Sequence, residues 1–185
     1  MYIINNKMES VNLIKNLHLN VLPEKIFNHY NKKEIEIFIA QFPADFYAVR
    51  DKTISMSKKY KLAVPKEEVV DYCKNLEKFS INVSSFNYSK NQLLCGEIKI
   101  NENMDVDYIL STNPNFSLRD CYQHPDFVGK VSVFDNKYKI DGLEKIIEYA
   151  LKYNLIGVII EFTLFNKKLG INNDNVVIWE LRSNY

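Results

Sequence analysis

Two apolar segments near the carboxyl terminus decide the expected fold. They read Gly157-Val-Ile-Ile-Glu-Phe-Thr-Leu-Phe165 and Asn175-Val-Val-Ile-Trp-Glu-Leu-Arg182. Both are rich in β-branched and aromatic residues, a composition typical of core strands. The polar residues between them, with Gly170, are typical of a loop. The sequence therefore predicts a β-hairpin that closes the chain.

Each of these strands carries a carboxylate in its apolar centre, Glu161 in the first and Glu180 in the second. Because side chains alternate along a strand, Glu180 and Arg182 are expected on one face and Trp179 on the other. Trp179 is thus expected to pack in the core, away from any ligand on the face of Glu180. A charge inside an apolar strand is costly unless it is paired, binds a cation or faces a solvent-filled cleft. The hairpin is therefore the first candidate for a functional site.

Length and composition indicate an ordinary globular protein. The chain has 185 residues, of which 46% are hydrophobic and 25% are charged. This length predicts a single domain, 1–185, with a division into a small lobe of about residues 1–100 and a C-terminal lobe of about residues 101–185.

The charge balance excludes several kinds of partner. A formal net charge of +1 argues against a protein that tracks the nucleic-acid backbone. No apolar run reaches the roughly 18 residues of a membrane span, and no signal peptide is visible. The three cysteines form no C-x-x-C pair, which fits a reducing compartment. We expect a soluble cytoplasmic protein without a membrane or nucleic-acid partner.

Hydrophobic periodicity predicts a mixture of helices and strands. Helices are expected at residues 8–17, at 32–41, from Pro65 and from Asp141, where Asp141 and Glu144 resemble a capping box. Strands are expected at residues 45–51, 58–64 and 106–111, and residues 81–86 and 92–100 are expected to pair around the turn 87–91. The fold class predicted from this pattern is α+β, with a largely antiparallel sheet and packed helices.

Several short pieces, taken in chain order, resemble one known family. They are Asn6-Lys7-Met-Glu-Ser-Val-Asn-Leu-Ile-Lys-Asn-Leu17 followed by Val21-Leu-Pro23, Phe46-Tyr-Ala-Val-Arg-Asp51, Leu93-Leu-Cys-Gly-Glu97, and Ile160-Glu-Phe162 with Val177-Ile-Trp-Glu-Leu-Arg182. Together they are similar to a compressed nucleotide-binding domain of phosphoenolpyruvate synthase and pyruvate phosphate dikinase, which belong to the ATP-grasp superfamily. The resemblance implies an ATP-grasp-like arrangement of two lobes that binds ATP or a related nucleotide with magnesium.

The resemblance also assigns roles to individual residues. It places Lys7 and Arg50 on nucleotide phosphates and assigns Glu97, on the strand that closes over the nucleotide, to nucleotide binding. It places Glu161 near the ribose or a magnesium ion. Glu180, a second magnesium ligand, and Arg182 are placed near the metal and the transferred phosphoryl group as the catalytic residues. Phosphoryl transfer needs cations on the phosphates and carboxylates that hold magnesium, and these residue types are present.

The chain departs from the family pattern in ways that limit this expectation. Glu180 stands where the dikinases have glutamine, Ser183 stands where they have proline, and no glycine-rich phosphate loop is visible. A complete dikinase is excluded, whereas a minimal ATP-grasp-like unit is consistent with the sequence. Phosphotransfer or ligation to an unknown acceptor is the catalytic hypothesis.

The alternative is a structural role for the same charges. Glu180 with Arg182, or Glu161 with Arg50, would then form an ion pair that is satisfied and closed to solvent. The protein would be a non-catalytic binding or interaction protein on a degenerate ATP-grasp-like scaffold, with a protein partner. The two hypotheses differ in whether these side chains reach solvent.

Three further residues lie in one polar loop. Arg119 is assigned to nucleotide binding, because its guanidinium can clamp an anion with two hydrogen bonds, or else it pairs with Asp120. Cys121 and His124 are the nearby nucleophile and acid–base candidates. Unreactive side chains are the more common outcome for both.

Overall fold

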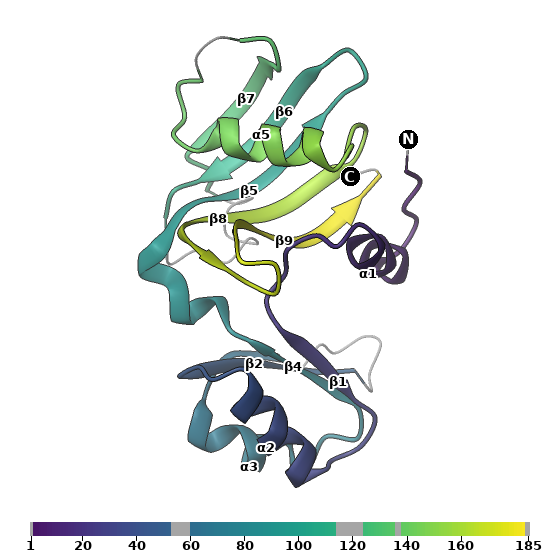
Figure 1. Ribbon diagram of the computed structural model, residues 1–185, viewed down its shortest axis with the longest axis vertical. Helices are drawn as coiled ribbons and strands as arrows, with labels where there is room; N and C mark the ends of the chain where they lie inside the picture. Colours follow the sequence, from purple (N-terminus) through teal and green to yellow (C-terminus); the bar gives the residue numbers. More distant parts are fainter. Residues whose placement is uncertain (1, 53–59, 114–123, 136–137, 184–185) are drawn as a thin grey trace. The chain divides into compact units, whose positions relative to one another are not determined.

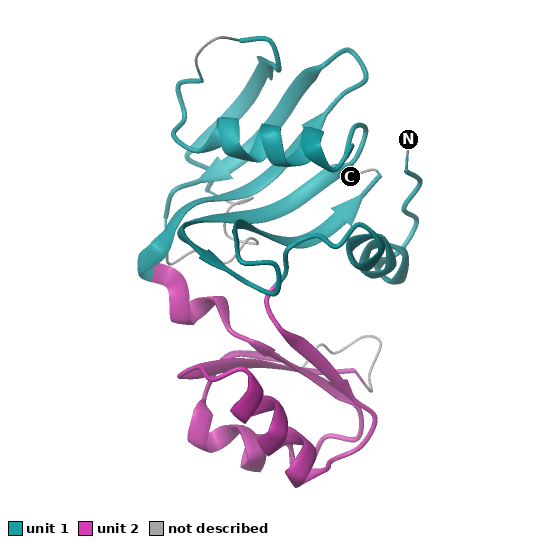
Figure 2. Cartoon of the chain, in the orientation of Figure 1, with its two compact units in different colours: residues 1–21, 90–185 teal, residues 22–89 magenta. Residues whose placement is uncertain are grey.

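The computed structural model describes residues 2–52, 60–113, 124–135 and 138–183. The chain divides into two compact units, which Figure 2 shows in different colours: unit 1 is Met1–Val21 with Lys90–Tyr185, and unit 2 is Leu22–Ser89. The amino-terminal segment thus belongs with the carboxyl-terminal part, and the boundary falls at residue 89 where the sequence prediction placed it near residue 100. The prediction of a single domain stays a prediction.

Unit 1 is built on a five-stranded antiparallel sheet in the order β7-β6-β5-β8-β9 (Figure 1). Its strands are β5 (Gln92–Ile100), β6 (Asp105–Ser111), β7 (Phe127–Ser132), β8 (Ile159–Leu169) and β9 (Asp174–Arg182). Helix α5 (Leu143–Lys152) covers one face of this sheet, and α1 (Lys7–Asn16) lies beside β9. Strands β8 and β9 form the predicted terminal hairpin, which is confirmed.

Alternation along these strands divides the sheet into two chemically different faces. Leu94 and Ile98 of β5 and Ile160 and Phe162 of β8 are buried in the same apolar cluster as the residues of α5. The intervening residues of both strands therefore point to the opposite face. The opposite face carries polar residues such as Thr163 together with buried apolar residues such as Ile159.

β9 is an edge strand of the sheet, and the amino-terminal segment covers its outer edge. Ser10 Oγ accepts a hydrogen bond from the Leu181 backbone N–H at 2.8 Å. Asn20 is buried, and its side-chain amide donates to the carbonyls of Val176 at 2.7 Å and Leu169 at 3.0 Å. An uncovered edge strand is a site of unwanted pairing, so these hydrogen bonds both fix α1 and protect β9.

Unit 2 is a four-stranded antiparallel sheet in the order β1-β4-β2-β3. Its elements are β1 (Glu24–Phe27), α2 (Lys32–Gln41), β2 (Phe46–Asp51), β3 (Tyr60–Pro65), the 3₁₀ helix η1 (Lys66–Glu68), α3 (Val69–Cys73) and β4 (Phe79–Val83). Helices α2 and α3 lie on one face (Figure 1). Their core is aromatic, with Phe27 stacked on Phe79 at 5.1 Å between ring centroids and Phe38 against Tyr47.

Two of the secondary-structure predictions were wrong. β4 and β5 do not pair, because the seven-residue 3₁₀ helix η2 (Ser85–Asn91) separates them and β4 pairs with β1 and β2 instead. Asp141 does not cap α5, whose N-cap is Gly142 at φ +89° without a side-chain hydrogen bond. A Cβ at Gly142 would lie 2.4 Å from a methyl of Leu164, so glycine suits both the backbone conformation and the packing there. Strands β1 and β7 were not predicted.

Helices α1 and α2 lie where the sequence predicted them, and α2 has the predicted bounds. Asn6 and Asn31 cap these two helices by accepting hydrogen bonds from backbone N–H groups of the first turn. The predicted α+β class with largely antiparallel sheets is confirmed.

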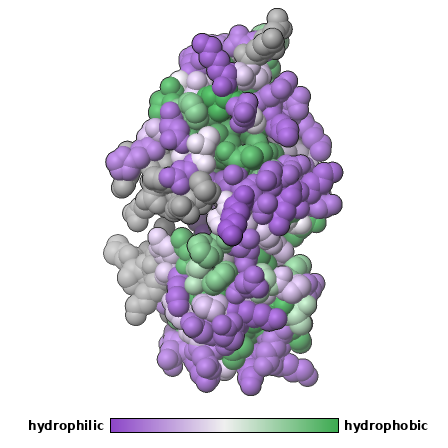
Figure 3. All heavy atoms as spheres, turned by 90° about the vertical axis from the view of Figure 1, so that its left-hand side faces the viewer, coloured by the Kyte–Doolittle hydropathy of each residue, from purple (hydrophilic) through white to green (hydrophobic). Residues whose placement is uncertain are grey.

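The face shown in Figure 3 is mostly hydrophilic, with smaller groups of apolar residues among the polar ones. Exposed large apolar side chains include Val128 and Phe134 in unit 1 and Ile26 and Phe86 in unit 2. Single exposed apolar residues are normal for a soluble protein and do not by themselves mark a binding site. No helix among the described residues is long and apolar enough to span a membrane.

Candidate functional site

Three glutamates from adjacent strands form one row on the face of unit 1 opposite α5. Glu97 of β5 is the register partner of Glu161 of β8, and Glu161 is the partner of Glu180 of β9. Directly paired residues in an antiparallel sheet have Cβ atoms about 5 Å apart and point to the same face. We call Glu97, Glu161 and Glu180 the carboxylate row.

Two basic side chains neutralise the ends of the carboxylate row. The Arg182 guanidinium contacts a carboxylate oxygen of Glu97, and Lys7 Nζ lies 3.4 Å from Glu180 Oε2. The sequence hypothesis of a structural pair had joined Arg182 to Glu180, the nearest acid along the chain. The Arg182–Glu97 pair was not predicted, because no sequence pattern brings β9 and β5 to either side of β8.

The carboxylate row runs from a buried end to an accessible end. The Glu97 side chain is 0% exposed, whereas Glu180 is 26%, Arg182 31% and Lys7 58% exposed. Burial raises the pKa of Glu97 to about 7, with the negative charges of Glu161 and Glu180 acting in the same direction. The guanidinium of Arg182 opposes this rise by stabilising the ionised form. Burial and the neighbouring carboxylates thus favour the protonated form of Glu97, and Arg182 favours its ionised form.

A β-bulge in β9 places Trp179 on the side of the carboxylate row. Glu161 pairs with Glu180 but Phe162 pairs with Ile178, so Trp179 is an extra residue in β9. Its indole N–H donates to Thr163 Oγ1 at 2.9 Å, and Thr163 shares a face with Glu161 two residues earlier. The prediction that Trp179 points away from this face was wrong, because a bulge breaks strict alternation. No signal in the sequence marks the bulge.

Unit 2 has its own polar face, opposite α2 and α3. Arg50 of β2 pairs in register with Ser80 of β4, and Ala48 pairs with Asn82. Ser80 and Asn82 are both buried, and within the described chain Ser80 Oγ and Asn82 Oδ1 have no hydrogen-bond partner. Buried polar atoms are normally satisfied, so these two are notable. The sequence analysis missed both because isolated Ser and Asn residues in a strand carry no distinctive pattern.

The other residues singled out from the sequence contribute less. Arg119 and Cys121 lie outside the described residues, and His124 is exposed. Within the part of the chain that is described, no group of three or more His, Cys, Asp or Glu side chains is arranged to hold a metal ion.

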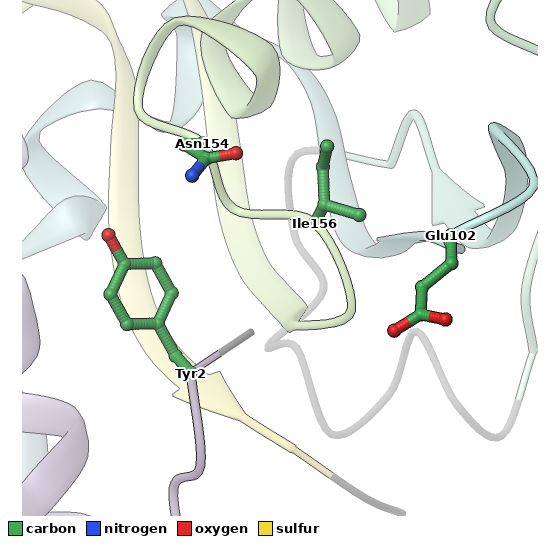
Figure 4. Close-up of a pocket in the computed structure, with 4 residues that line it drawn as sticks. All are labelled: Tyr2, Glu102, Asn154 and Ile156. Carbon is green, nitrogen blue, oxygen red and sulfur yellow. The ribbon is translucent and has the colours of Figure 1, made fainter.

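A pocket of about 380 Å³ lies at another place in unit 1. Its described walls are Tyr2, Glu102, Asn154 and Ile156, which come from the amino-terminal segment, the β5–β6 turn and the loop after α5 (Figure 4). No member of the carboxylate row is among these lining residues. The pocket and the carboxylate row are therefore separate features of the same unit.

Comparisons with known proteins support the fold. No protein-family model matches the chain, and no curated protein matches it in sequence. Among solved structures, it is similar to an N5-carboxyaminoimidazole ribonucleotide synthetase in its ADP complex, with 12% identity and a TM-score of 0.53 over 97% of this chain and 45% of that one. Other similar structures are an N5-carboxyaminoimidazole synthase from Aspergillus clavatus with ADP and 5-aminoimidazole ribonucleotide (13% identity, TM-score 0.49, 98% of this chain, 45% of that one) and the ATP-grasp ligase PsnB complexed with minimal precursor, Mg and ADP (10% identity, TM-score 0.45, 95% of this chain, 49% of that one).

The fold is therefore ATP-grasp-like, as the sequence resemblance implied. The chain spans about half the length of the solved structures that it matches. Identities this low establish the fold alone. The finer resemblance to phosphoenolpyruvate synthase stays a prediction.

Proposed function

We propose that this protein binds ATP or a related nucleotide together with magnesium at the carboxylate row of unit 1. One observation carries the proposal: three glutamates lie side by side on one sheet face with a basic side chain at each end, and Glu180, Arg182 and Lys7 reach solvent. Phosphoryl chemistry requires this combination, with cations on the phosphates and oxygen ligands on the metal. The similar synthetase was solved as an ADP complex, which adds support from the fold.

The residues of the carboxylate row suit magnesium. Glu161 and Glu180 are register partners, so their carboxylates can share one ion. Magnesium is commonly held by one or two carboxylates together with substrate phosphates and water, so a third protein ligand is not required. When bound, the ion would supply charge neutralisation at the phosphates. Lys7 and Arg182 would contact the phosphates from the protein side.

The remaining assignments from the sequence are part of this proposal. Arg50, on the polar face of unit 2 where it pairs in register with Ser80, stays a predicted nucleotide ligand. Arg119 stays a predicted nucleotide ligand. The proposed reaction is phosphotransfer or ligation to an unidentified acceptor. A more specific hypothesis is that the chain resembles the nucleotide-binding domain of the dikinases.

Intrinsic fluorescence offers a direct test, because Trp179 is the only tryptophan in the chain and lies beside the carboxylate row. We expect ATP to change the emission of Trp179 in the presence of magnesium and to do so much less in its absence. ADP, GTP and AMP, titrated in the same way, report the base and the number of phosphates required. Glu180→Gln should weaken the magnesium-dependent change by about tenfold or more in apparent affinity.

Two variants make the fluorescence result specific. Glu148→Gln removes an exposed carboxylate on α5 and should bind like the parent protein. Trp179→Phe removes the signal but should keep the thermal stabilisation by nucleotide, which amounts to roughly 2.7 kcal/mol at 100 times the dissociation constant. The proposal fails if millimolar ATP with magnesium alters neither the fluorescence nor the melting temperature of the parent.

The alternative is a non-catalytic interaction protein on the same scaffold. It requires side chains that satisfy one another and are closed to solvent, whereas Glu180 and Arg182 are about a quarter to a third exposed. This exposure favours the ligand-binding proposal. A protein that binds nucleotide but never releases ADP with any acceptor would be assigned to the non-catalytic class.

A further inference from the structure

The ion pair between Glu97 and Arg182 joins strands that are not neighbours. β8 lies between β5 and β9, so the two backbones are about 10 Å apart. The register partners of the two residues on β8 are Glu161 for Glu97 and Ile159 for Arg182. The arginine side chain therefore crosses β8 diagonally, beside Glu161, to meet Glu97.

The two ends of this pair differ in their access to solvent. Glu97 is completely buried, while the Arg182 side chain is 31% exposed. Neither carboxylate oxygen of Glu97 makes a hydrogen bond to another described residue, so within the described chain the carboxylate is neutralised by the Arg182 guanidinium. A buried carboxylate is strongly unfavourable without a counter-charge. Because the buried carboxylate of Glu97 requires a counter-charge, Glu97 holds the Arg182 guanidinium in place.

We propose that Glu97 is a positioning residue that does not touch the ligand itself: it holds the Arg182 guanidinium across β8, next to Glu161 and Glu180, where Arg182 contacts a phosphate. This inference rests on the proposed function for its ligand, but the anchoring of Arg182 is a property of the free protein. It replaces the direct nucleotide contact that the sequence resemblance assigned to Glu97.

A purely electrostatic role and a positioning role of Glu97 predict opposite effects of Glu97→Gln on the affinity for nucleotide. If Glu97 acted only through its negative charge, Glu97→Gln would tighten the binding of an anionic nucleotide by removing repulsion. If Glu97 positions Arg182, the same substitution weakens binding, because the guanidinium is no longer held in place. The direction of one affinity change therefore separates the two roles.

A double-mutant cycle measures this, with affinity for ATP and magnesium determined by calorimetry for the parent, Glu97→Gln, Arg182→Met and the double variant. We expect Glu97→Gln to weaken binding by about tenfold in the parent and to have no weakening effect in the Arg182→Met background. Glu148→Gln is the matched control for loss of one carboxylate. Equal weakening by Glu97→Gln in both backgrounds, or tighter binding in the parent, overturns the positioning role.

A second measurement needs no nucleotide. The chain has only three arginines, Arg50, Arg119 and Arg182, so its guanidinium ¹⁵N NMR spectrum is simple. We expect hindered rotation of the Arg182 guanidinium in the parent and in Glu148→Gln, and clearly faster rotation in Glu97→Gln. Unchanged hindrance in Glu97→Gln overturns the proposal whether or not ATP binds.

The two readouts keep the proposals distinguishable. Loss of hindrance in Glu97→Gln, in a parent protein that does not bind ATP, supports Glu97 as the anchor and overturns the nucleotide proposal alone. Should Glu97→Gln not fold, Glu97→Asp keeps the charge but shortens the side chain by one methylene. That variant is expected to release Arg182 in the same NMR measurement.

Discussion

The two units have the same layered architecture but carry different polar groups. Each packs helices on one face of an antiparallel sheet and presents polar groups on the other. The polar face of unit 1 carries the carboxylate row with Arg182 and Lys7, whereas that of unit 2 places Arg50 beside the uncharged Ser80 and Asn82. The core of unit 1 is mainly aliphatic, and that of unit 2 is centred on stacked aromatic rings. The comparison shows that two sheets with the same arrangement of helices can have different apolar cores and different polar faces.

The units can also be compared experimentally, because each has one buried cysteine among its described residues. Cys95 belongs to unit 1 and Cys73 to unit 2, and both are buried. Burial raises the pKa of Cys73 to about 12, so this thiol is unreactive until unit 2 opens. In a Cys121→Ser background, thiol labelling of Cys95 and Cys73 reports the opening of each unit.

The largest expected effect is that of Gly96→Ala in unit 1. Gly96 has φ +143°, and an added Cβ would lie 2.1 Å from the carbonyl oxygen of Ile109 on β6. Backbone strain and backbone overlap together should destabilise unit 1 by about 4 kcal/mol or more. We expect labelling of Cys95 to accelerate strongly while that of Cys73 stays near its parent rate.

Gly129→Ala is the matched control on β7. Its added Cβ would meet the hydroxyl of Tyr108, the end of a side chain that can move, and its effect should be much smaller. Equal acceleration of the labelling of Cys73 and Cys95 in Gly96→Ala would show that the two units unfold as one. Their stabilities would then not be separable.

Phe79→Ala should give the reciprocal result in unit 2. Phe79 is fully buried and stacked on Phe27, so truncation leaves a cavity and should cost about 3–4 kcal/mol. Labelling of Cys73 should accelerate and labelling of Cys95 should not. Ile37→Ala, on the exposed face of α2, is the control and should leave both rates nearly unchanged.

The pH dependence of stability should be larger in unit 1 than in unit 2. The pKa of Glu97 is raised to about 7 in the folded protein, so the folded state binds more protons than the unfolded state between about pH 4.5 and pH 7. The contribution of Glu97 to the free energy of unfolding is fully present below the pKa that Glu97 has in the unfolded chain. It is lost as pH rises through the pKa of Glu97 in the folded protein. We expect the free energy of unfolding of unit 1 to fall by on the order of 2–3 kcal/mol from pH 5 to pH 8.

Denaturant unfolding at several pH values, followed through Trp179 for unit 1, measures this dependence. Glu97→Gln should flatten the profile, and Glu148→Gln should not. A parent profile that rises from pH 5 to pH 8 would mean that the attraction of Arg182 outweighs the burial of Glu97.

Helix caps give the smallest effects. Asn6→Ala in unit 1 and Asn31→Ala in unit 2 each remove a side chain that accepts hydrogen bonds from the first helical turn, and each should cost about 1 kcal/mol in its own unit. Asp141→Ala should change stability by only a few tenths of a kcal/mol, because α5 begins at Gly142 without a side-chain cap. Thermal melts of the three variants suffice. A loss at Asp141 equal to that at Asn6 would indicate that Asp141 does cap α5 in solution.

The sequence by itself determined the local features of this protein. Apolar periodicity and capping residues specify α1 and α2, and the β-branched runs specify β8 and β9, because these patterns act between residues close in the chain. The sequence also marked Glu161, Glu180 and Arg182, since charges in the middle of apolar strands are costly and stand out.

Only the tertiary structure decided which of these groups meet. The bulge that turns Trp179 toward the carboxylate row, the pairing of Arg182 with Glu97 across β8 and the covering of β9 by the amino-terminal segment all join residues distant in sequence. Strand order and register fix such contacts, and a one-residue change in register moves every side chain of a strand to the other face. Single residues such as Glu97 and Ser80 therefore acquire their surroundings only in the folded sheet.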